Sequence, residues 1–110
     1  MLGIKLYLAQ RICALVMAPL VLAHLAVMIY AVHNGLSAAE ILSRTQGSVG
    51  WMLFYSVFVL AVSVHAAIGL RVIAFETLKV EGVVLDALTA LVLLVLMALG
   101  IKAVYAVTIT

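Results

Sequence analysis

Three long runs of apolar residues dominate the pattern of this chain, and most of the polar residues lie in the short stretches between them. The runs cover about residues 12–32, 50–73 and 83–107. Each is long enough to cross the hydrocarbon core of a bilayer, which takes roughly 20 apolar residues in a helix. The pattern therefore predicts three transmembrane helices within a single domain, residues 1–110.

The connections between these runs are short and carry turn and capping signals. His33-Asn34-Gly35 is typical of a turn after the first helix. Ser37 and Glu40 have the spacing of a capping box, which indicates a short surface helix ending near Arg44. The second connection, residues 76–82, contains both signs of charge and ends at a glycine.

The composition agrees with a membrane location. Of the 110 residues, 69% are hydrophobic and 9% are charged, which leaves too few polar side chains to cover a water-soluble domain. We expect an all-α integral membrane protein. The first run is longer than the core of a signal peptide and contains His24, so we expect it to be retained. The net charge of +2 gives no reason to expect a nucleic-acid partner, and the single Cys13 cannot form an intrachain disulfide.

Basic residues are distributed unevenly between the two sides of the predicted bundle. With three spans, Lys5, Arg11, Arg71 and Lys79 share the side of the N-terminus, whereas the opposite side has Arg44 and Lys102. The positive-inside rule then predicts that the N-terminus is cytoplasmic, or on the matrix side of a mitochondrial inner membrane.

Two histidines lie within the apolar runs and are the main candidates for chemistry. His24 and His65 are flanked by apolar turns on both sides, whereas His33 lies at a membrane edge, where water or headgroups solvate it. An unsatisfied polar group in lipid costs several kcal/mol, so each buried imidazole needs a partner. Haem ligation is the functional interpretation, and a hydrogen bond to a neighbouring helix is the alternative.

The two histidines are predicted to lie at different depths. Counting along each run at a rise of ~1.5 Å per residue gives an offset of roughly 8 Å between them. That offset exceeds the ~4 Å that separates two nitrogen ligands on opposite faces of one iron, with iron–nitrogen bonds near 2 Å as for other metals. We therefore expect separate sites, each completed by a ligand from another chain.

Several other residues have a predicted place in or near such a site. Gly69 lies one helical turn after His65 and leaves room for a flat macrocycle. Arg11 and Arg71 lie in the same leaflet, where they can pair with haem propionates or hydrogen-bond a quinone carbonyl; snorkelling is the alternative for both. Tyr7 lies one turn before Arg11 and can add a hydroxyl.

Proline and serine also occur within the runs. Pro19 cannot donate a backbone hydrogen bond and crowds the carbonyl of Leu15, which predicts a kink one turn before His24. The kink either orients the side chain of His24 or has no role of its own, since membrane helices tolerate proline. Ser56 and Ser63 are expected to be helix-packing residues.

These residues resemble the membrane-anchor subunits of the succinate dehydrogenase and fumarate reductase family, the succinate:quinone oxidoreductases of respiratory complex II. The spacing His65-x-x-x-Gly69-x-Arg71-x-x-x-x-Glu76 is similar to that of the family's haem-ligating second helix. Gln10-Arg11-Ile12-Cys13-Ala14 resembles the family's His-Arg-x-Ser-Gly motif, and residues 19–25 resemble the stretch that carries a histidine in two-haem members.

The resemblance implies a cytochrome b anchor that forms half of a haem-binding helical bundle with a partner anchor subunit. His65 matches the axial ligand of haem b, and His24 matches the ligand of a second haem. Arg11 matches the arginine of the quinone site and the propionates, and Tyr7 and Glu76 are further quinone-site candidates. Electrons would pass between the iron–sulfur subunit and membrane quinone, with a flavoprotein subunit carrying out the tricarboxylic acid cycle chemistry on succinate or fumarate. The expected location is a bacterial or archaeal cytoplasmic membrane or the mitochondrial inner membrane.

The chain departs from the family pattern at four positions. Cys13 and Ala14 replace a serine and a glycine, Tyr7 stands where a serine is frequent, and Thr77 follows Glu76 where one subunit type has a tyrosine. Two other functions were considered: a haem-free anchor or assembly subunit, and a small transporter. A proton-coupled transporter needs a carboxylate within the membrane, and the first two spans have none between Ile12 and Arg71.

Overall fold

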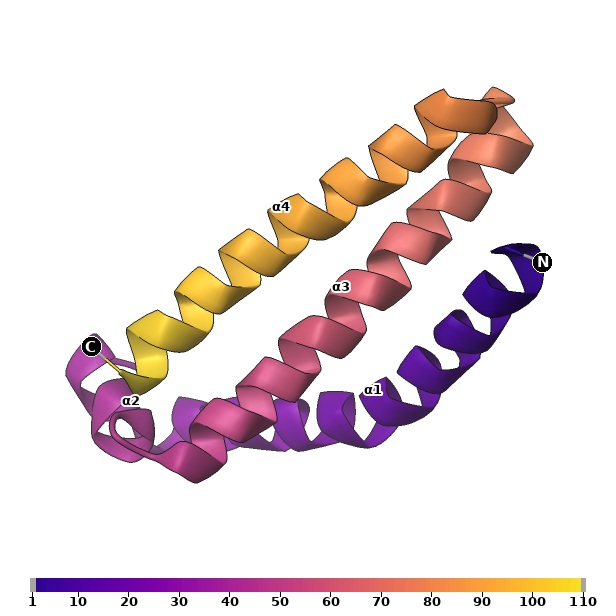
Figure 1. Ribbon diagram of the computed structural model, residues 1–110. Helices are drawn as coiled ribbons and strands as arrows, with labels where there is room; N and C mark the ends of the chain where they lie inside the picture. Colours follow the sequence, from indigo (N-terminus) through magenta and orange to yellow (C-terminus); the bar gives the residue numbers. More distant parts are fainter. Residues whose placement is uncertain (1, 110) are drawn as a thin grey trace.

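The fold consists of three long helices and one short helix. The computed structural model describes residues 2–109, with α1 at Leu2–Asn34, α2 at Ala38–Thr45, α3 at Val49–Leu78 and α4 at Gly82–Thr108 (Figure 1). The three long helices are all long and apolar enough to span a membrane. This confirms the prediction of an all-α membrane protein with three spans. The helices extend beyond the predicted apolar runs, because helical hydrogen bonding continues into the polar segments at each end.

Helix α3 lies between α1 and α4 and contacts both of them (Figure 1). The N-terminus lies at the same end of the bundle as the α3–α4 connection, whereas the C-terminus lies next to α2 at the other end. We call the end with the N-terminus the proximal end and the end with α2 the distal end.

Small side chains are buried where the helices pack. Ala61, Ser63 and Ala67 are buried on α3, as is usual where membrane helices pack. On α4, Gly100 lies against Val59. The expected packing role of Ser63 agrees with its burial, whereas Ser56 is exposed on this chain.

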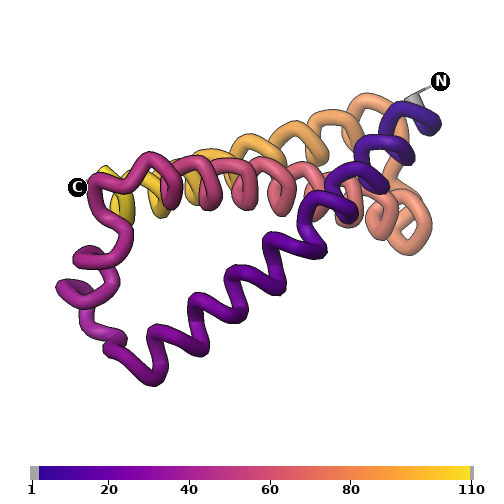
Figure 2. The backbone as a smooth tube through the Cα atoms, turned by 90° about the horizontal axis from the view of Figure 1, so that it is seen from below, coloured from indigo at the N-terminus to yellow at the C-terminus, as the bar shows by residue number. Residues whose placement is uncertain are grey.

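Helix α1 bends near its middle, where it contains Pro19 (Figures 1 and 2). Proline removes one backbone hydrogen bond and its ring displaces the carbonyl one turn earlier, which bends a helix at that position. In Figure 2 the second half of α1 diverges from α3 and α4 toward the distal end. The predicted kink is therefore present, and it opens the distal side of the bundle.

Helix α2 begins with a capping interaction and ends against α4. The Ser37 hydroxyl oxygen accepts a hydrogen bond from the Glu40 amide at 3.1 Å, as predicted. The Glu40 side chain differs from the expected capping box, because it accepts a hydrogen bond from the Ser37 hydroxyl at 2.8 Å. At the other end of α2, the Thr45 hydroxyl donates to the Val107 carbonyl at 2.6 Å and the Gly47 amide donates to the Thr108 carbonyl at 2.7 Å. These bonds satisfy carbonyls at the C-terminus of α4 that have no partner within their own helix.

Candidate functional site

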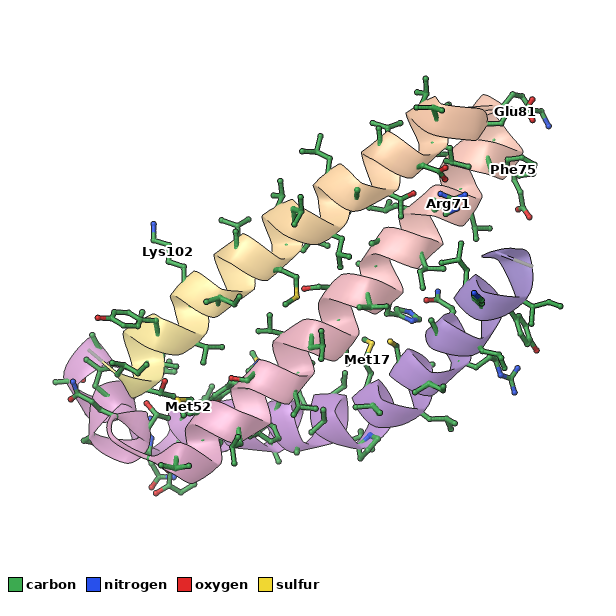
Figure 3. The ribbon with its side chains drawn as sticks, in the orientation of Figure 1. Met17, Met52, Arg71, Phe75, Glu81 and Lys102 are labelled. Carbon is green, nitrogen blue, oxygen red and sulfur yellow. The ribbon has the colours of Figure 1, made fainter. Side chains whose placement is uncertain are left out.

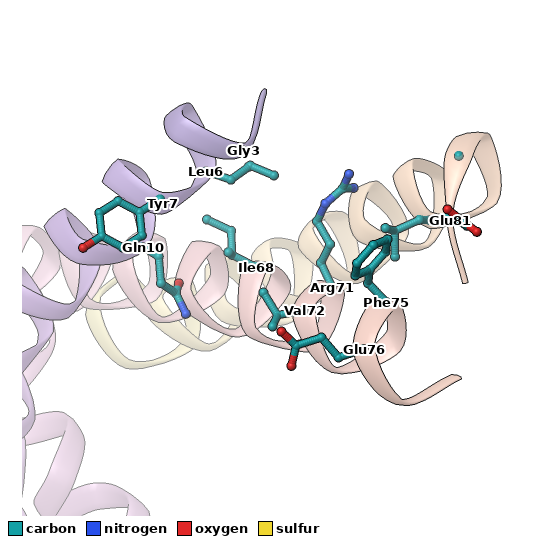
Figure 4. Close-up of a pocket in the computed structure, with 12 residues that line it drawn as sticks. Gly3, Leu6, Tyr7, Gln10, Ile68, Arg71, Val72, Phe75, Glu76 and Glu81 are labelled. Carbon is teal, nitrogen blue, oxygen red and sulfur yellow. The ribbon is translucent and has the colours of Figure 1, made fainter. Parts of the chain in front are cut away.

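A cavity of about 530 Å³ lies at the proximal end, between the start of α1, the end of α3 and the start of α4 (Figure 4). Most of its wall is apolar. Its polar lining consists of Tyr7, Gln10, Arg71, Glu76 and Glu81. A mainly apolar cavity with a few convergent polar groups is the usual form of a small-molecule site.

Gln10 of α1 lies next to Gly69 of α3 at this cavity. A Cβ placed on Gly69 would lie 3.8 Å from Nε2 of Gln10, which is ordinary van der Waals contact. The Oε1 atom of Gln10 is buried and has no hydrogen-bond partner among the described residues. A ligand that donates a hydrogen bond would satisfy this oxygen.

His65 lies one turn before Gly69, so the two residues share the face of α3 that meets α1. Its side chain is half-buried, and its Nδ1 atom is buried with no partner in the described part of the chain. The hydrogen bond to a neighbouring helix that was considered for this imidazole is therefore not made through Nδ1 within this chain.

Tyr7 and Arg11 lie on the outer part of α1. Tyr7 is exposed and lines the cavity, and the Arg11 guanidinium carbon lies 5.7 Å from the centre of the Tyr7 ring, a cation–π contact. Arg11 itself is exposed and does not line the cavity. Of this predicted pair, the structure thus brings only Tyr7 into the cavity.

Arg71 and Glu76 both line the cavity, but their side chains leave α3 in different directions (Figure 4). Nη1 of Arg71 lies 2.8 Å from Oδ1 of Asp86 and 3.2 Å from Oγ1 of Thr89, both on α4. Arg71 is therefore held by α4 and does not simply reach toward the membrane surface, which was the alternative considered for it.

A second cavity, of about 510 Å³, lies at the distal end between α1, α2 and α3. His24 lines it together with Tyr30, Arg44, Trp51 and Tyr55. The Arg44 side chain donates to the Gly35 carbonyl at 2.7 Å and lies 5.3 Å from the centre of the Tyr30 ring. This distal cavity therefore combines an imidazole, an aromatic wall and one guanidinium.

The His24 ring is held against aromatic side chains of α3. Its centre lies 5.9 Å from that of Tyr55, edge to face, and 5.2 Å from that of Phe58. Its Nδ1 atom is buried and has no hydrogen-bond partner among residues 2–109. Both membrane-embedded histidines thus have a buried ring nitrogen without a partner in the part of the chain that the structure describes, whereas His33 is exposed at the end of α1.

The register places the two buried histidines at different depths. His24 is level with Tyr55 and Phe58, and His65 follows these residues by ten and seven positions on α3. At ~1.5 Å per residue the separation along the axis is roughly 10–15 Å. This axial offset is larger than the roughly 8 Å that counting along the apolar runs predicted.

Sequence reasoning did not select three residues that the structure places at these cavities or beside them. Gln10 occupies the position of a histidine in the family motif, and this could have identified it. No role was predicted for Asp86, and Arg44 was used only to mark the end of the short helix and the topology. Their partners come from other helices, so no local pattern indicates their contacts.

Comparison with known proteins identifies the family. The sequence profile of the succinate dehydrogenase/fumarate reductase transmembrane subunit matches residues 1–109, nearly the whole chain. No curated protein and no solved structure gave a significant match. Because the matched region includes all three spans and both cavities, the chain belongs to the family of succinate dehydrogenase/fumarate reductase transmembrane subunits.

Proposed function

We propose that this membrane anchor binds haem b through His65 and passes electrons between the iron–sulfur clusters of a partner subunit and quinone in the membrane. The observation that carries the proposal is the half-buried imidazole of His65, whose Nδ1 atom is buried without a partner. It lies within a membrane span, one turn from the glycine that meets Gln10. An ionisable residue in this environment is a functional candidate by default.

His65 lines neither the proximal nor the distal cavity, and it is the chemistry of its side chain that fits a haem. Neutral imidazole is a common axial ligand of haem iron, and one protein ligand on each face is enough to hold it. Among the described residues no three His, Cys, Asp or Glu side chains gather as they would around a bare metal ion. The guanidinium of Arg11 is exposed on α1 at the proximal end and is available to a propionate.

The second axial ligand of this haem comes from another chain in this proposal. His24 lies roughly 10–15 Å from His65 along the helix axis at ~1.5 Å per residue, too far for both to bind one iron. A second membrane-anchor subunit that packs beside α1 and α3 would supply the missing ligand. The many exposed apolar side chains along these helices leave faces for that subunit as well as for lipid.

The proximal cavity is the proposed quinone site. Quinone reduction takes up protons with electrons, so the site needs hydrogen-bond donors for the carbonyl oxygens and a route to water. Tyr7 and Arg71 supply donors, and Gln10 supplies a buried acceptor for a quinol hydroxyl. Glu76 lines the same cavity and is exposed to solvent, so its carboxylate can exchange protons with water.

When bound, haem supplies a one-electron redox centre between the iron–sulfur cluster and the quinone. The residues of this chain hold it and orient the quinone, whereas dicarboxylate chemistry belongs to the flavoprotein subunit. The positive-inside pattern favours a proximal end that faces the cytoplasm or matrix, where the soluble subunits would dock.

His24 is the proposed ligand of a second haem in the distal cavity. This assignment is supported by its buried Nδ1 without a partner and by the adjoining cavity of about 510 Å³. Aromatic side chains form one wall, and the Arg44 guanidinium offers a partner to a carboxylate.

Two competing functions have less support. A haem-free anchor with hydrogen-bonded histidines would need partners for Nδ1 of His24 and His65 from other chains, because the described residues offer none. A proton-coupled transporter would need a carboxylate within the membrane. Asp86 lies near the start of α4 and is paired with Arg71.

The first test is an absorption spectrum of the purified complex in the oxidised and reduced states. The intact complex is expected to give a low-spin b-type spectrum, and His65→Ala should abolish the contribution of the haem that His65 binds. His33→Ala is the matched control, because this histidine is exposed and should leave the spectrum unchanged. His65→Met retains a potential axial ligand and should shift the spectrum instead of removing it. An unchanged spectrum in His65→Ala would refute the assignment.

Haem counting tests the second site. The ratio of haem to polypeptide should fall in His24→Ala while the His65-dependent spectrum is retained. A ratio identical to that of the unmodified complex would exclude His24 as a ligand.

A further inference from the structure

We infer that Asp86 is a positioning residue that holds Arg71 at the wall of the proximal cavity, with the free N–H edge of its guanidinium available to a bound quinone. This inference rests on the proposed quinone site. It assigns a role to the α4 carboxylate, which itself does not line the cavity.

Arg71 and Asp86 form an ion pair between α3 and α4. Nη1 of Arg71 donates to Oδ1 of Asp86 at 2.8 Å and to Oγ1 of Thr89 at 3.2 Å. The Thr89 hydroxyl in turn donates to the Leu85 carbonyl at 2.8 Å, which fixes its oxygen toward Arg71 as an acceptor. Both hydrogens of one guanidinium nitrogen are therefore directed at α4.

Nε and Nη2 of Arg71 carry the remaining N–H donors. A guanidinium has five N–H donors in a rigid plane, so fixing Nη1 at two acceptors also fixes the plane. No acceptor for Nε or Nη2 is found among the described residues. Arg71 lines the proximal cavity, and its side chain is 17% exposed. Arg71 also lines a smaller cavity, of about 230 Å³, between α3 and α4, so its guanidinium plane is held in a set orientation between two cavities.

Two simpler explanations of the ion pair do not hold: charge compensation within α3 and a contribution to stability. Glu76, the carboxylate on the same helix, points away from Arg71, so the charge of Arg71 is balanced from α4 and not from its own helix (Figure 4). The Asp86 side chain is 59% exposed, and an ion pair with such an exposed partner contributes little to stability. Its main consequence is the orientation of a long, flexible side chain that would otherwise have many rotamers.

The test measures quinone reduction or quinol oxidation by the assembled complex with a short-chain, water-soluble quinone as the probe. Asp86→Asn removes the charge at nearly constant shape, and Arg71→Gln removes the guanidinium. Each is expected to raise the KM for quinone several-fold with a small change in kcat, because the affected group binds and orients the substrate. Thr89→Val, which keeps the Asp86 charge, should have a smaller effect.

The double variant Arg71→Gln/Asp86→Asn distinguishes positioning from an independent effect. If Asp86 acts through Arg71, the double variant has the same KM as Arg71→Gln alone. The haem spectrum and the melting temperature of each variant check that the complex is intact, and Asp86→Glu should restore most of the affinity.

Two results would overturn the inference. A raised KM in Arg71→Gln with an unchanged KM in Asp86→Asn would refute the role of Asp86 and leave the quinone site standing. An unchanged KM in Arg71→Gln, in an intact complex, would refute the assignment of the proximal cavity as the quinone site and this inference with it.

Discussion

Gly100 of α4 lies directly against Val59 of α3, and a Cβ added to the glycine would overlap Cγ1 of the valine. Valine in a helix has one strongly preferred rotamer, so its methyl groups cannot easily turn away. The close approach of α3 and α4 near the distal end therefore depends on the absence of a side chain at position 100.

Gly100→Ala is expected to destabilise the α3–α4 pair by about 1–3 kcal/mol, the usual cost of overpacking. Thermal unfolding of the detergent-solubilised complex measures the loss. Combining it with Val59→Ala makes room for the added methyl group, so the double variant should be more stable than Gly100→Ala alone. No difference between these two variants would show that the backbones separate at little cost.

Thr45→Val is expected to loosen the contact between α2 and the end of α4. The valine keeps the shape of the buried side chain but removes the donor to the Val107 carbonyl, which leaves a helix-terminal acceptor without its partner. The expected cost is about 1–3 kcal/mol. Faster amide exchange in the last turn of α4 would report it. The control is Ser43→Ala, whose hydroxyl bonds only to the Glu40 carbonyl on an exposed surface and whose loss should leave α4 unchanged.

Gly35→Ala is expected to destabilise the α1–α2 connection, for two reasons. Gly35 has a φ of +129°, which side chains with L configuration rarely adopt, and the Glu40 carboxylate occupies the space that its Cβ would need. Backbone strain of this kind costs about 1–3 kcal/mol. Gly47→Ala is the matched control, because Gly47 also has a positive φ of +76° but nothing lies within 4 Å of an added Cβ. Equal losses of melting temperature in the two variants would show that the Glu40 carboxylate is not an obstacle.

Pro19→Ala is expected to straighten α1, because alanine restores the amide that can bond the Leu15 carbonyl. A straighter α1 would shift the second half of the helix, including His24, relative to α3. On the proposed function, haem content should fall toward that of His24→Ala, while the spectrum that depends on His65 is retained. A haem content equal to that of the unmodified complex would show that the bend does not serve the distal site.

The amino-acid sequence by itself determined that the protein lies in a membrane, that it has three spans, and that a short capped helix ends near Arg44. These features depend on local composition and on the preference of each residue for its neighbours within one or two turns, so they can be read along the chain. The spacing of His65 to Gly69 is equally local, because a helix places residues four apart on one face.

The tertiary structure decided which of these residues meet. The bond from Arg71 to Asp86 joins residues fifteen apart across two helices, and the contact of Gln10 with Gly69 joins the first and third. The divergence of α1 that sets His24 beside Tyr55 depends on the direction in which one proline bends its helix. Such contacts follow from helix register, crossing geometry and side-chain volume at the interface, which are properties of pairs of helices and are not encoded in the pattern of any single segment.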